Sequence, residues 1–316
     1  MSPHHRPYDL VYGVPRGAEL PPGQPVVDYD LNRLREVSGR EVLIAELPGI
    51  DRSAHHVLFN VLPHTPMSQV EQDLSAAGRI LQPGGTLRVE AHDAKAARRL
   101  GKMVRQRFSQ VRVERGGVTA YVCAQPRTAD TVASNNRTEV RYRDAVTDRE
   151  FRFVTRPGLF GFRAVDPGTE LLVEAMGEVA DLNVLDVGCG YGLLGLVAAA
   201  RGAQVTMIDS DLRAVTLARE NLAVHGLEGL VALADGIVDQ PSSSFDRVLS
   251  NPPTHASSAV LRHLFSEMVR VLKGGTARIV IREHLNYEKW LTALGGVQRI
   301  ATGRGYKVLE FPSAPS

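Results

Sequence analysis

Two periods of hydrophobicity alternate along this chain, and they predict a regular succession of strands and helices. Segments with apolar residues at every third or fourth position predict amphipathic helices, whereas short apolar runs bounded by glycine, proline or polar residues predict strands. Residues 1–25 contain six prolines and no continuous apolar run, and we expect them to be irregular. The elements predicted in the following hundred or so residues are the strands Val42–Ala45 and His56–Val61, a helix over 66–82, the strand Thr86–Ala91, the helix Ala94–Phe108, and the strands Val111–Val113 and Val118–Ala124.

A polar stretch at 125–137 predicts a linker, and the alternation of strands and helices resumes after it. The elements predicted there are an antiparallel pair, Val140–Tyr142 with Phe151–Val154, a helix that starts at Asp166-Pro167, a strand, turn and helix over 183–200, the strand Val205–Ile208, the helix Leu212–His225, the strands Leu230–Leu233, Arg247–Leu249 and Ala277–Ile281, and a hairpin over 297–311. Strands that alternate with helices imply a parallel, doubly wound sheet. We therefore predict an α/β fold with two domains, 1–130 and 137–316.

The two halves repeat each other. Shifted by 190 positions, Leu58–Pro63 overlies Val248–Pro253, and without a gap Leu81–Val89 overlies Val271–Ile279. Unrelated strand–helix–strand units can also align by chance, but a match through both Gly-Gly turns favours a duplication. The first copy shows neither a glycine-rich turn nor an Asn-Pro-Pro sequence, so we expect a degenerate domain that keeps the scaffold and has lost the site.

Composition narrows the classes of function. The chain has 316 residues and a formal net charge of +2, which is too small to indicate a polyanionic partner by itself. Its two cysteines, Cys123 and Cys189, lie far apart in the sequence, which argues against a disulfide framework or a zinc motif and fits a reducing cytoplasm. No apolar run has the length of a membrane span or the form of a signal peptide. We expect a cytoplasmic monomer with no metal and no membrane partner.

The most informative stretch is Asn183–Gly195, in which an apolar run ends in an acid and three alternating glycines, and a helix follows. A strand, a tight glycine turn and a helix N-terminus together turn backbone N–H groups toward a ligand. The stretch contains the dinucleotide fingerprint Gly190-x-Gly192-x-x-Gly195, which alone is a weak signal. The order Asp-x-Gly-x-Gly-x-Gly instead resembles motif I of class I S-adenosylmethionine (SAM) methyltransferases. This resemblance makes the candidate cofactor turn Asp186, Gly188, Cys189, Gly190 and Gly192.

Acids follow the next two predicted strands. Asp209 comes about 20 residues after the turn begins, which is where an acid holds a ribose diol in this topology. Asp211 competes for that role, although it also suits the cap of the following helix. Asp235 ends the next strand, where it could bind the adenine amine or be an ordinary turn acid. The cofactor candidates therefore extend to Asp209, Ser210, Asp235 and Gly236.

The sequence Asn251-Pro252-Pro253 follows a predicted strand and resembles the motif of amino methyltransferases that act on adenine, guanine or glutamine amides. The amine of such a substrate is conjugated, so its lone pair is a poor nucleophile until the nitrogen pyramidalises. The Asn251 side-chain oxygen and the Pro252 carbonyl can accept its two N–H bonds, and prolines hold both acceptors rigidly. A chance loop is the alternative. We predict that Asn251, Pro252 and Pro253 are catalytic and that Asn251 also borders the cofactor.

Two further residues near these motifs are candidates for substrate binding. His255 could stack on a base, bind a phosphate or transfer a proton, with an ordinary loop histidine as the alternative. Because the methylated amine becomes acidic, no strong base is needed, and we predict a contact rather than a catalyst. Phe160 lies in the predicted loop Arg156–Phe160 and could shape the pocket entrance, whereas a buried position is the commoner fate of an aromatic residue.

Positive charge is concentrated in one segment, where Lys95 and Arg115 bound eight basic residues and a single acid, Glu114. A solvated helix face explains part of this pattern, but charge of one sign is also what a phosphate-contacting surface needs. A second basic group, between Arg137 and Arg152, is partly offset by acids. The residues predicted to contact RNA are Arg98, Arg99, Lys102 and Arg105.

Taken together, Arg156–Phe160, Asp186–Gly190 and Asn251–His255 resemble the RsmC/RlmG family of ribosomal RNA guanine-N2 methyltransferases. The resemblance covers the second half by motif and the first half by architecture. It implies a Rossmann-like class I fold, duplicated, and methyl transfer from SAM to the exocyclic N2 amine of a guanine. The implied partner is ribosomal RNA or the assembling small ribosomal subunit, with 16S rRNA as the substrate.

The sequence departs from the family at Thr254, where an aromatic residue is usual. A π-face under a flipped base contributes on the order of 1–3 kcal/mol. Because threonine cannot supply it, His255 or another residue must stack on the base, and Thr254 remains a candidate contact. The departure leaves open a methyltransferase for a small-molecule amine or a protein glutamine amide. A SAM-fold binding module without activity is the third possibility.

Overall fold

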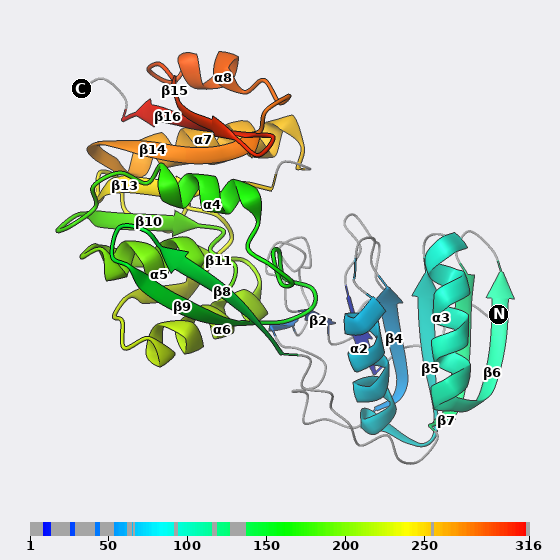
Figure 1. The fold of residues 1–316 in the computed structure, drawn as a ribbon. Coiled ribbons are helices and arrows are strands. Elements are labelled where there is room, and N and C mark those ends of the chain that lie inside the picture. Colours follow the sequence, from blue (N-terminus) through cyan, green and yellow to red (C-terminus); the bar gives the residue numbers. More distant parts are fainter. Residues whose placement is uncertain are drawn as a thin grey trace. The chain divides into compact units, whose positions relative to one another are not determined.

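The computed structural model describes residues 9–13, 26–28, 42–44, 54–61, 65, 67–91, 94–115, 119–126, 137–253 and 256–313. The chain divides into two compact units, Met1–Asn136 and Arg137–Ser316, each built around its own sheet (Figure 1). The polar stretch that was predicted to be a linker falls largely at 127–136, outside the described residues. In the described part of the chain, no helix combines the length and apolar character needed to cross a membrane.

The first unit is a seven-stranded sheet with the strand order β3-β2-β1-β4-β5-β7-β6. Its first five strands in chain order are parallel to one another, and β7 runs antiparallel to both β5 and β6. Its described elements are β1 (Leu10–Tyr12), β2 (Val26–Asp28), β3 (Val42–Ile44), β4 (Ala54–Val61), α2 (Met67–Ile80), β5 (Leu81–Ala91), α3 (Ala94–Arg107), β6 (Phe108–Arg115) and β7 (Thr119–Pro126).

The second unit repeats this topology, with the strand order β12-β11-β10-β13-β14-β16-β15, and adds a two-stranded antiparallel pair, β8–β9. Its elements are β8 (Thr138–Asp144), β9 (Arg149–Thr155), α4 (Pro167–Glu174), β10 (Asn183–Val187), α5 (Leu193–Ala200), β11 (Gln204–Asp209), α6 (Leu212–Val224), β12 (Leu230–Leu233), β13 (Phe245–Ser250), α7 (Ser258–Val271), β14 (Leu272–Arg282), α8 (Glu288–Thr292), β15 (Gln298–Gly303) and β16 (Tyr306–Pro312).

Both faces of the second sheet are buried. Successive side chains of a strand point to opposite faces, so neighbouring residues belong to different clusters. On β10, Val184 packs in one apolar cluster together with α4, α5, α6 and the β8–β9 pair. Its neighbour Leu185 packs in a second cluster together with α7 and α8. Strands buried on both sides explain the continuous apolar runs from which they were predicted. The strands β10, β11, β12 and β13 are parallel to one another. Their carboxyl ends therefore share one edge of the sheet, where a ligand can bind.

Identical strand order in the two sheets confirms the predicted duplication, but two details of the prediction are wrong. The stretch expected to be irregular, 1–25, contains β1, an inner strand of the sheet that lies between β2 and β4. The predicted alignment without a gap is also wrong. Ala54 pairs with Leu81 in the first sheet as Phe245 pairs with Leu272 in the second, so equivalent residues at these positions are 191 apart and not 190. After the Gly-Gly turns the offset is 190, so the first copy carries one extra residue in the turn, and Asn60 corresponds to Asn251.

Candidate active site

The glycine turn after β10 presents its backbone to open space. Gly188 and Gly190 have φ values of 72° and 56°, and a Cβ added at either would meet no atom within 4 Å. Gly188 N and Cys189 N donate to Ile208 O at 2.9 and 3.0 Å, which fixes the turn against β11. Gly192 has a different role, because a Cβ there would lie 2.7 Å from Leu196 Cδ1 at the start of α5. The predicted turn thus combines two glycines with open space over their Cα atoms, Gly188 and Gly190, with a third, Gly192, that packing requires.

Asp186 lies beneath this turn and is completely buried. One carboxylate oxygen, Oδ2, accepts a hydrogen bond of 2.9 Å from Gly195 N. The other, Oδ1, has no hydrogen-bond partner among the described residues. Burial raises the pKa of Asp186 from 3.8 to about 7, with a small contribution from the negative charge of Asp209. A buried carboxylate oxygen without a donor suits a ligand that carries a cationic or N–H group.

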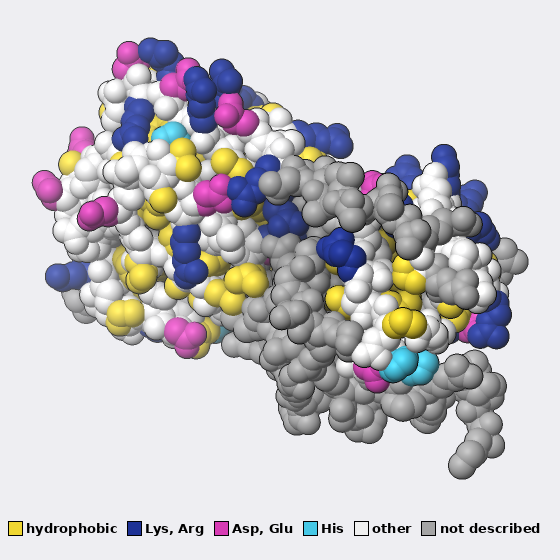
Figure 2. All heavy atoms as spheres, turned by 90° about the horizontal axis from the view of Figure 1, so that it is seen from below, with side chains coloured by type: hydrophobic (Ala, Val, Ile, Leu, Met, Phe, Trp, Pro, Cys, Tyr) yellow, Lys and Arg dark blue, Asp and Glu magenta, His cyan; other side chains and the backbone are white. Residues whose placement is uncertain are grey.

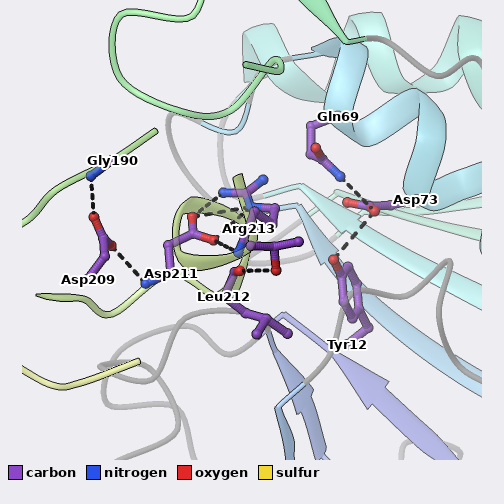
Figure 3. A network of polar contacts seen from close by, with 9 residues as sticks. Tyr12, Gln69, Asp73, Gly190, Asp209, Asp211, Leu212 and Arg213 are labelled. Atoms are coloured by element: carbon purple, nitrogen blue, oxygen red, sulfur yellow. Dashed lines mark hydrogen bonds and ion pairs between the residues drawn. The ribbon is translucent and has the colours of Figure 1, made fainter. Parts of the chain in front are cut away.

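Asp209 joins the end of β11 to the glycine turn (Figure 3). Its Oδ2 accepts from Gly190 N at 2.9 Å, and its Oδ1 accepts from Asp211 N at 2.9 Å. Asp211 caps α6 and forms an ion pair with the buried Arg213, with oxygen and nitrogen 2.6 Å apart. The alternative that Asp211 is a helix cap is therefore confirmed, and Asp209 remains the half-buried acid at the strand end.

The neighbouring strand end carries the remaining cofactor candidates. Leu233 of β12 pairs with Asp209, and Ala234 N donates to Asp209 O at 3.0 Å, which brings Asp235 to the same edge of the sheet. Gly236 has a φ of 74° with open space over its Cα. Ser210 and Asp235 are both half-buried. Two acids and a glycine on adjoining strand ends could hold a nucleoside: one acid at the ribose diol, the other at the base amine.

Asn251 follows β13, two strands away from β11 on the other side of β10. Its Nδ2 donates to Thr169 Oγ1 at 2.9 Å and to Asp166 Oδ2 at 3.2 Å. The described residues give its Oδ1 no donor. Pro252 is buried and Pro253 is exposed, and the Pro253 carbonyl accepts from Ala256 N at 2.8 Å. The side-chain oxygen of Asn251 is thus an acceptor at the same sheet edge as the glycine turn.

The other predicted substrate contacts have mixed outcomes. Phe160 is 64% exposed, in the loop between β9 and α4, so it is not a core aromatic. Thr254 and His255 lie outside the described residues. The predicted helix start at Asp166-Pro167 is confirmed, with Asp166 as the N-cap of α4, but sequence reasoning missed the contact of Asp166 with Asn251. It also missed Tyr306, which donates to Asp166 Oδ1 at 3.1 Å from β16.

On the first unit, Arg98, Arg99, Lys102 and Arg105 are exposed on α3, and no ion pair involves them within the described residues. Lysine and arginine side chains gather on this part of the first unit in Figure 2, whereas basic and acidic side chains alternate on the second. Other members of the basic segment are paired, Arg107 with Glu71 and Arg112 with Glu114. The described residues contain no cluster of three side chains able to bind a metal.

The second unit matches a known family over nearly its whole length. The family model described as methyltransferase small domain covers residues 150–310, which is about half of the chain. The chain belongs to the methyltransferase small domain family. The matched residues include the glycine turn, Asp209, Asp235 and Asn251, so every candidate described at this sheet edge falls within the family's domain.

Curated relatives match about half of the chain. The chain is 36% identical over 178 residues to the ribosomal RNA small subunit methyltransferase C of Pseudomonas entomophila, covering 53% of each protein. It is 36% identical over 166 residues to the protein of that name from Chromohalobacter salexigens, covering 49% of this chain and 50% of the relative. The chain therefore spans about half the length of the curated relatives it matches. These matches confirm the resemblance to the RsmC/RlmG family.

A solved structure matches both units. The 16S rRNA N2 G1207 methyltransferase (RsmC) from T. thermophilus, in complex with AdoMet and guanosine, superposes with a TM-score of 0.84 at 25% identity. The superposition covers 92% of this chain and 82% of that one. Because it extends beyond the second unit, the match confirms the duplicated Rossmann-like fold for the whole chain.

Proposed function

We propose that this protein is a SAM-dependent methyltransferase that acts on the exocyclic N2 amine of a guanine in ribosomal RNA, with 16S rRNA as the substrate. The observation that carries the proposal is the Asn251 amide, which has both N–H hydrogens engaged by Asp166 and Thr169 and its oxygen left as an acceptor. This acceptor shares a sheet edge with a glycine turn and with the acids of a nucleoside site.

The residues at the strand ends fit the cofactor. Open space over Gly188 and Gly190 leaves room for a ligand against the backbone, and Asp209 suits the ribose diol. Asp235, beside Gly236, suits the adenine amine. The orphaned Asp186 Oδ1 suits the positively charged amino-acid end of SAM. When bound, SAM would supply the electrophilic methyl group. The glycine turn, Asp209 and Asp235 would hold the cofactor.

The contribution of the chain to the transfer is alignment. Asn251 Oδ1 and the Pro252 carbonyl would accept the two N–H bonds of the guanine amine and turn its lone pair toward the methyl group. Holding two reactants in such geometry can contribute several kcal/mol to lowering a barrier. The amine loses a proton after the transfer, so the site needs no strong base. For this reason we place His255 among the contacts.

The identity of the substrate is supported by the relatives and by the exposed loop. The curated relatives are named small subunit methyltransferases, and the T. thermophilus structure contains guanosine. Thr254 cannot stack on a base, but Phe160 is exposed in the loop that leads into α4, whose first residues contact Asn251. We propose Phe160 as the aromatic contact of the flipped guanine, and Thr254 and His255 as further contacts on the basis of the sequence alone.

The first unit would dock the RNA through α3. Four exposed basic side chains without an ion pair among the described residues, on two adjoining helical turns, suit a row of phosphates. The partner is then ribosomal RNA or the assembling small subunit, in the cytoplasm, with the protein acting as a monomer. The proposed domains, 1–130 for docking and 137–316 for catalysis, divide these tasks.

The test is direct identification of the methylated nucleoside. The protein is incubated with SAM carrying a labelled methyl group and with 16S rRNA, 23S rRNA or small subunits from cells that lack the corresponding gene. Digestion to nucleosides should give labelled N2-methylguanosine from 16S rRNA or the small subunit. Asn251→Ala serves as the control that binds SAM without transferring the methyl group. Label in another nucleoside, or in none, would contradict the guanine assignment.

The missing aromatic at Thr254 favours one second candidate, transfer to a small-molecule amine or a protein glutamine amide. A glutamine amide is also planar and also offers two N–H bonds to Asn251 and Pro252. The same labelled SAM, added to RNase-treated extract of the deletion strain, distinguishes the two substrates. Label that persists in protein or small molecules after RNA removal would support the second candidate.

A further inference from the structure

The Asn251 side chain can occupy one site in two orientations that differ by a half-turn about its last bond. They have nearly the same shape and opposite chemistry, because one presents an acceptor to the substrate and the other presents a donor. Only the acceptor orientation can bind a substrate amine. Some part of the protein must therefore select the orientation, and the residues that do so contribute to specificity without touching the substrate.

The selecting contacts lie behind the amide. Thr169 Oγ1 and Asp166 Oδ2 receive the two N–H bonds of Asn251, at 2.9 and 3.2 Å. An ionised carboxylate has no hydrogen to donate, so a turned amide would place its oxygen against the oxygen of Asp166. Charge-assisted hydrogen bonds are about twice as strong as neutral ones, which makes Asp166 the stronger of the two selectors.

Asp166 is itself held from two elements. Thr169 N donates to its Oδ2 at 3.0 Å within α4, and Tyr306 Oη donates to its Oδ1 at 3.1 Å from β16. Burial and the charge of Asp166 raise the pKa of Tyr306, so the phenol stays a donor at neutral pH. Its ring lies against Gly168, where an added Cβ would come within 2.6 Å of Tyr306 Cδ1. The guanidinium of Arg282 stacks on the ring, 4.6 Å from its centroid.

We propose that Asp166, Thr169 and Tyr306 are positioning residues that lock the Asn251 amide with its oxygen toward the substrate amine. This inference rests on the proposed role of Asn251 and adds three residues from α4 and β16 to it. It also explains why Tyr306 of the hairpin and the first turn of α4 meet next to the residue that follows β13. The alternative is that Asp166 only caps a helix and Tyr306 only packs against it.

Substitutions that change one hydrogen bond at a time distinguish positioning of the Asn251 amide from a purely structural role of the three residues. Thr169→Val keeps the shape of the side chain and removes the acceptor, and Thr169→Ser restores it. Tyr306→Phe removes only the phenol oxygen. Asp166→Asn keeps an oxygen for the helix cap but adds an amide donor that can face Asn251. As a matched control, Thr292→Val removes a helical hydroxyl that donates to Glu288 O in α8 and has no further hydrogen bond among the described residues.

The expected results are graded. Thr169→Val should lower kcat by roughly fivefold to tenfold, the effect of one neutral hydrogen bond. Tyr306→Phe should lower kcat by a similar factor, because its phenol bonds to the Asp166 carboxylate and acts on Asn251 only through it. Asp166→Asn should lower kcat by roughly tenfold to a hundredfold, the effect of a bond to a charged group. SAM affinity should stay within about twofold of the parent in all variants, Thr169→Ser should recover most of the rate, and Thr292→Val should match the parent.

A second readout does not depend on turnover. The side-chain amide protons of Asn251, assigned from signals lost in Asn251→Ala, should be protected from hydrogen exchange in the parent and lose protection in Thr169→Val and Asp166→Asn. Variants that lower only the melting temperature, with kcat and amide protection unchanged, would reduce the three residues to a helix cap and its packing. If the parent methylates no RNA, the proposed function fails, while the exchange measurement still tests the locking of the amide.

Discussion

The carboxyl edges of the two sheets share a backbone and differ in a few side chains. Gly13 after β1 and Gly188 after β10 have φ values of 77° and 72°. Gly13 N donates to Val27 O at 3.2 Å, as Gly188 N donates to Ile208 O at 2.9 Å. The strand registers then place Asp28 at the position of Asp209. They likewise align Asn60 with Asn251. The first copy has thus kept a glycine, an acid and an amide at the positions of the candidate site.

What the first copy has lost is the environment of these groups. Val11 stands where the second copy has Asp186, so the first copy lacks the buried carboxylate of that position. Asn60 is 4% exposed and donates through Nδ2 to Gly13 O at 2.9 Å, within its own sheet. Asp28 is completely buried, whereas Asp209 is half-buried. The difference shows that a site disappears through the direction and burial of a few side chains while the fold persists.

The largest effect should be the loss of methyl-transfer rate when the Asn251 amide is removed, compared with removal of the equivalent amide of Asn60. Asn251→Ala should lower the rate of methyl transfer roughly a hundredfold to a thousandfold, since alignment of the amine is lost in the transition state. SAM affinity should hardly change. Asn60→Ala should instead cost about 1–3 kcal/mol of unfolding free energy, because the buried Gly13 carbonyl loses its donor. Kinetics and denaturant titration of both variants check this, and near-normal turnover in Asn251→Ala would reject the alignment mechanism.

The next effect concerns charge, which also divides the two units. Reversing Arg98, Arg99, Lys102 and Arg105 to glutamate should weaken rRNA binding by about a hundredfold or more at 0.05 M salt and flatten the log–log salt dependence by about one unit per lost phosphate contact. The control is a reversal on the β8–β9 pair, where arginines already face acids: Arg141 with Glu139, Arg143 with Asp148 and Arg152 with Glu150.

Reversing those three paired arginines should change rRNA affinity much less, and SAM affinity should be the same in both sets of variants. Filter binding or anisotropy over a range of salt concentrations measures the slope. An unchanged slope in the α3 variant would show that these charges are merely solvated, and it would strengthen the small-molecule candidate.

A smaller difference is expected between variants of Asp209 and Asp28, the two acids at equivalent strand ends, when SAM affinity is measured. Asp209→Ala removes a charged acceptor worth roughly 1.5–3 kcal/mol, so SAM should bind about tenfold to a hundredfold more weakly. Asp209→Asn, which keeps one acceptor, should fall between this variant and the parent. Asp28→Ala should leave SAM affinity unchanged, and calorimetry should give one SAM per chain. A second bound SAM would contradict the loss of the site in the first unit.

Sequence reasoning succeeded where the pattern is long. The helices α2 and α3 and the strand–turn–helix at Gly188 lie within a few residues of their predictions, because each carries several turns or a run of apolar residues. It failed at β1 and β2, which are three residues long and surrounded by prolines, too short to show a period. The offset of one residue before Gly84 escaped it because an extra residue in a turn changes no hydrophobic pattern.

The same reasoning found the polar residues of the candidate site but missed the residues that position them. Asp186, Asp209 and Asn251 stand out because each is a polar residue at, or directly after, the end of an apolar strand. Tyr306 gave no such signal: it begins a hairpin strand 55 residues after Asn251, and only the antiparallel pairing of β16 with β14 brings it to Asp166. Contacts of this kind depend on topology, so local patterns cannot predict them.

The smallest effect we predict is the pH dependence of stability and SAM affinity that Asp186 causes. The first unit has Val11 at the equivalent position, and this side chain does not titrate. The pKa of Asp186 is raised to about 7 by burial, well above its value in an unfolded chain. The unliganded folded state therefore binds the proton more tightly, so the stability contributed by this group is present at low pH and lost as pH rises from about 4 to about 7.

Binding of the cationic end of SAM should favour the ionised carboxylate of Asp186, which reverses the preference of the unliganded protein. SAM affinity should then fall by about fivefold between pH 7 and pH 6, since Asp186 must release a proton on binding and its pKa in the unliganded protein is about 7. Asp186→Asn should bind SAM more weakly and with little pH dependence in this range, while keeping an oxygen for Gly195 N. Calorimetry in buffers of different ionisation enthalpy measures the released proton directly. Equal pH dependence in the parent and in Asp186→Asn would show that another group governs the titration and that Asp186 serves only to hold the start of α5.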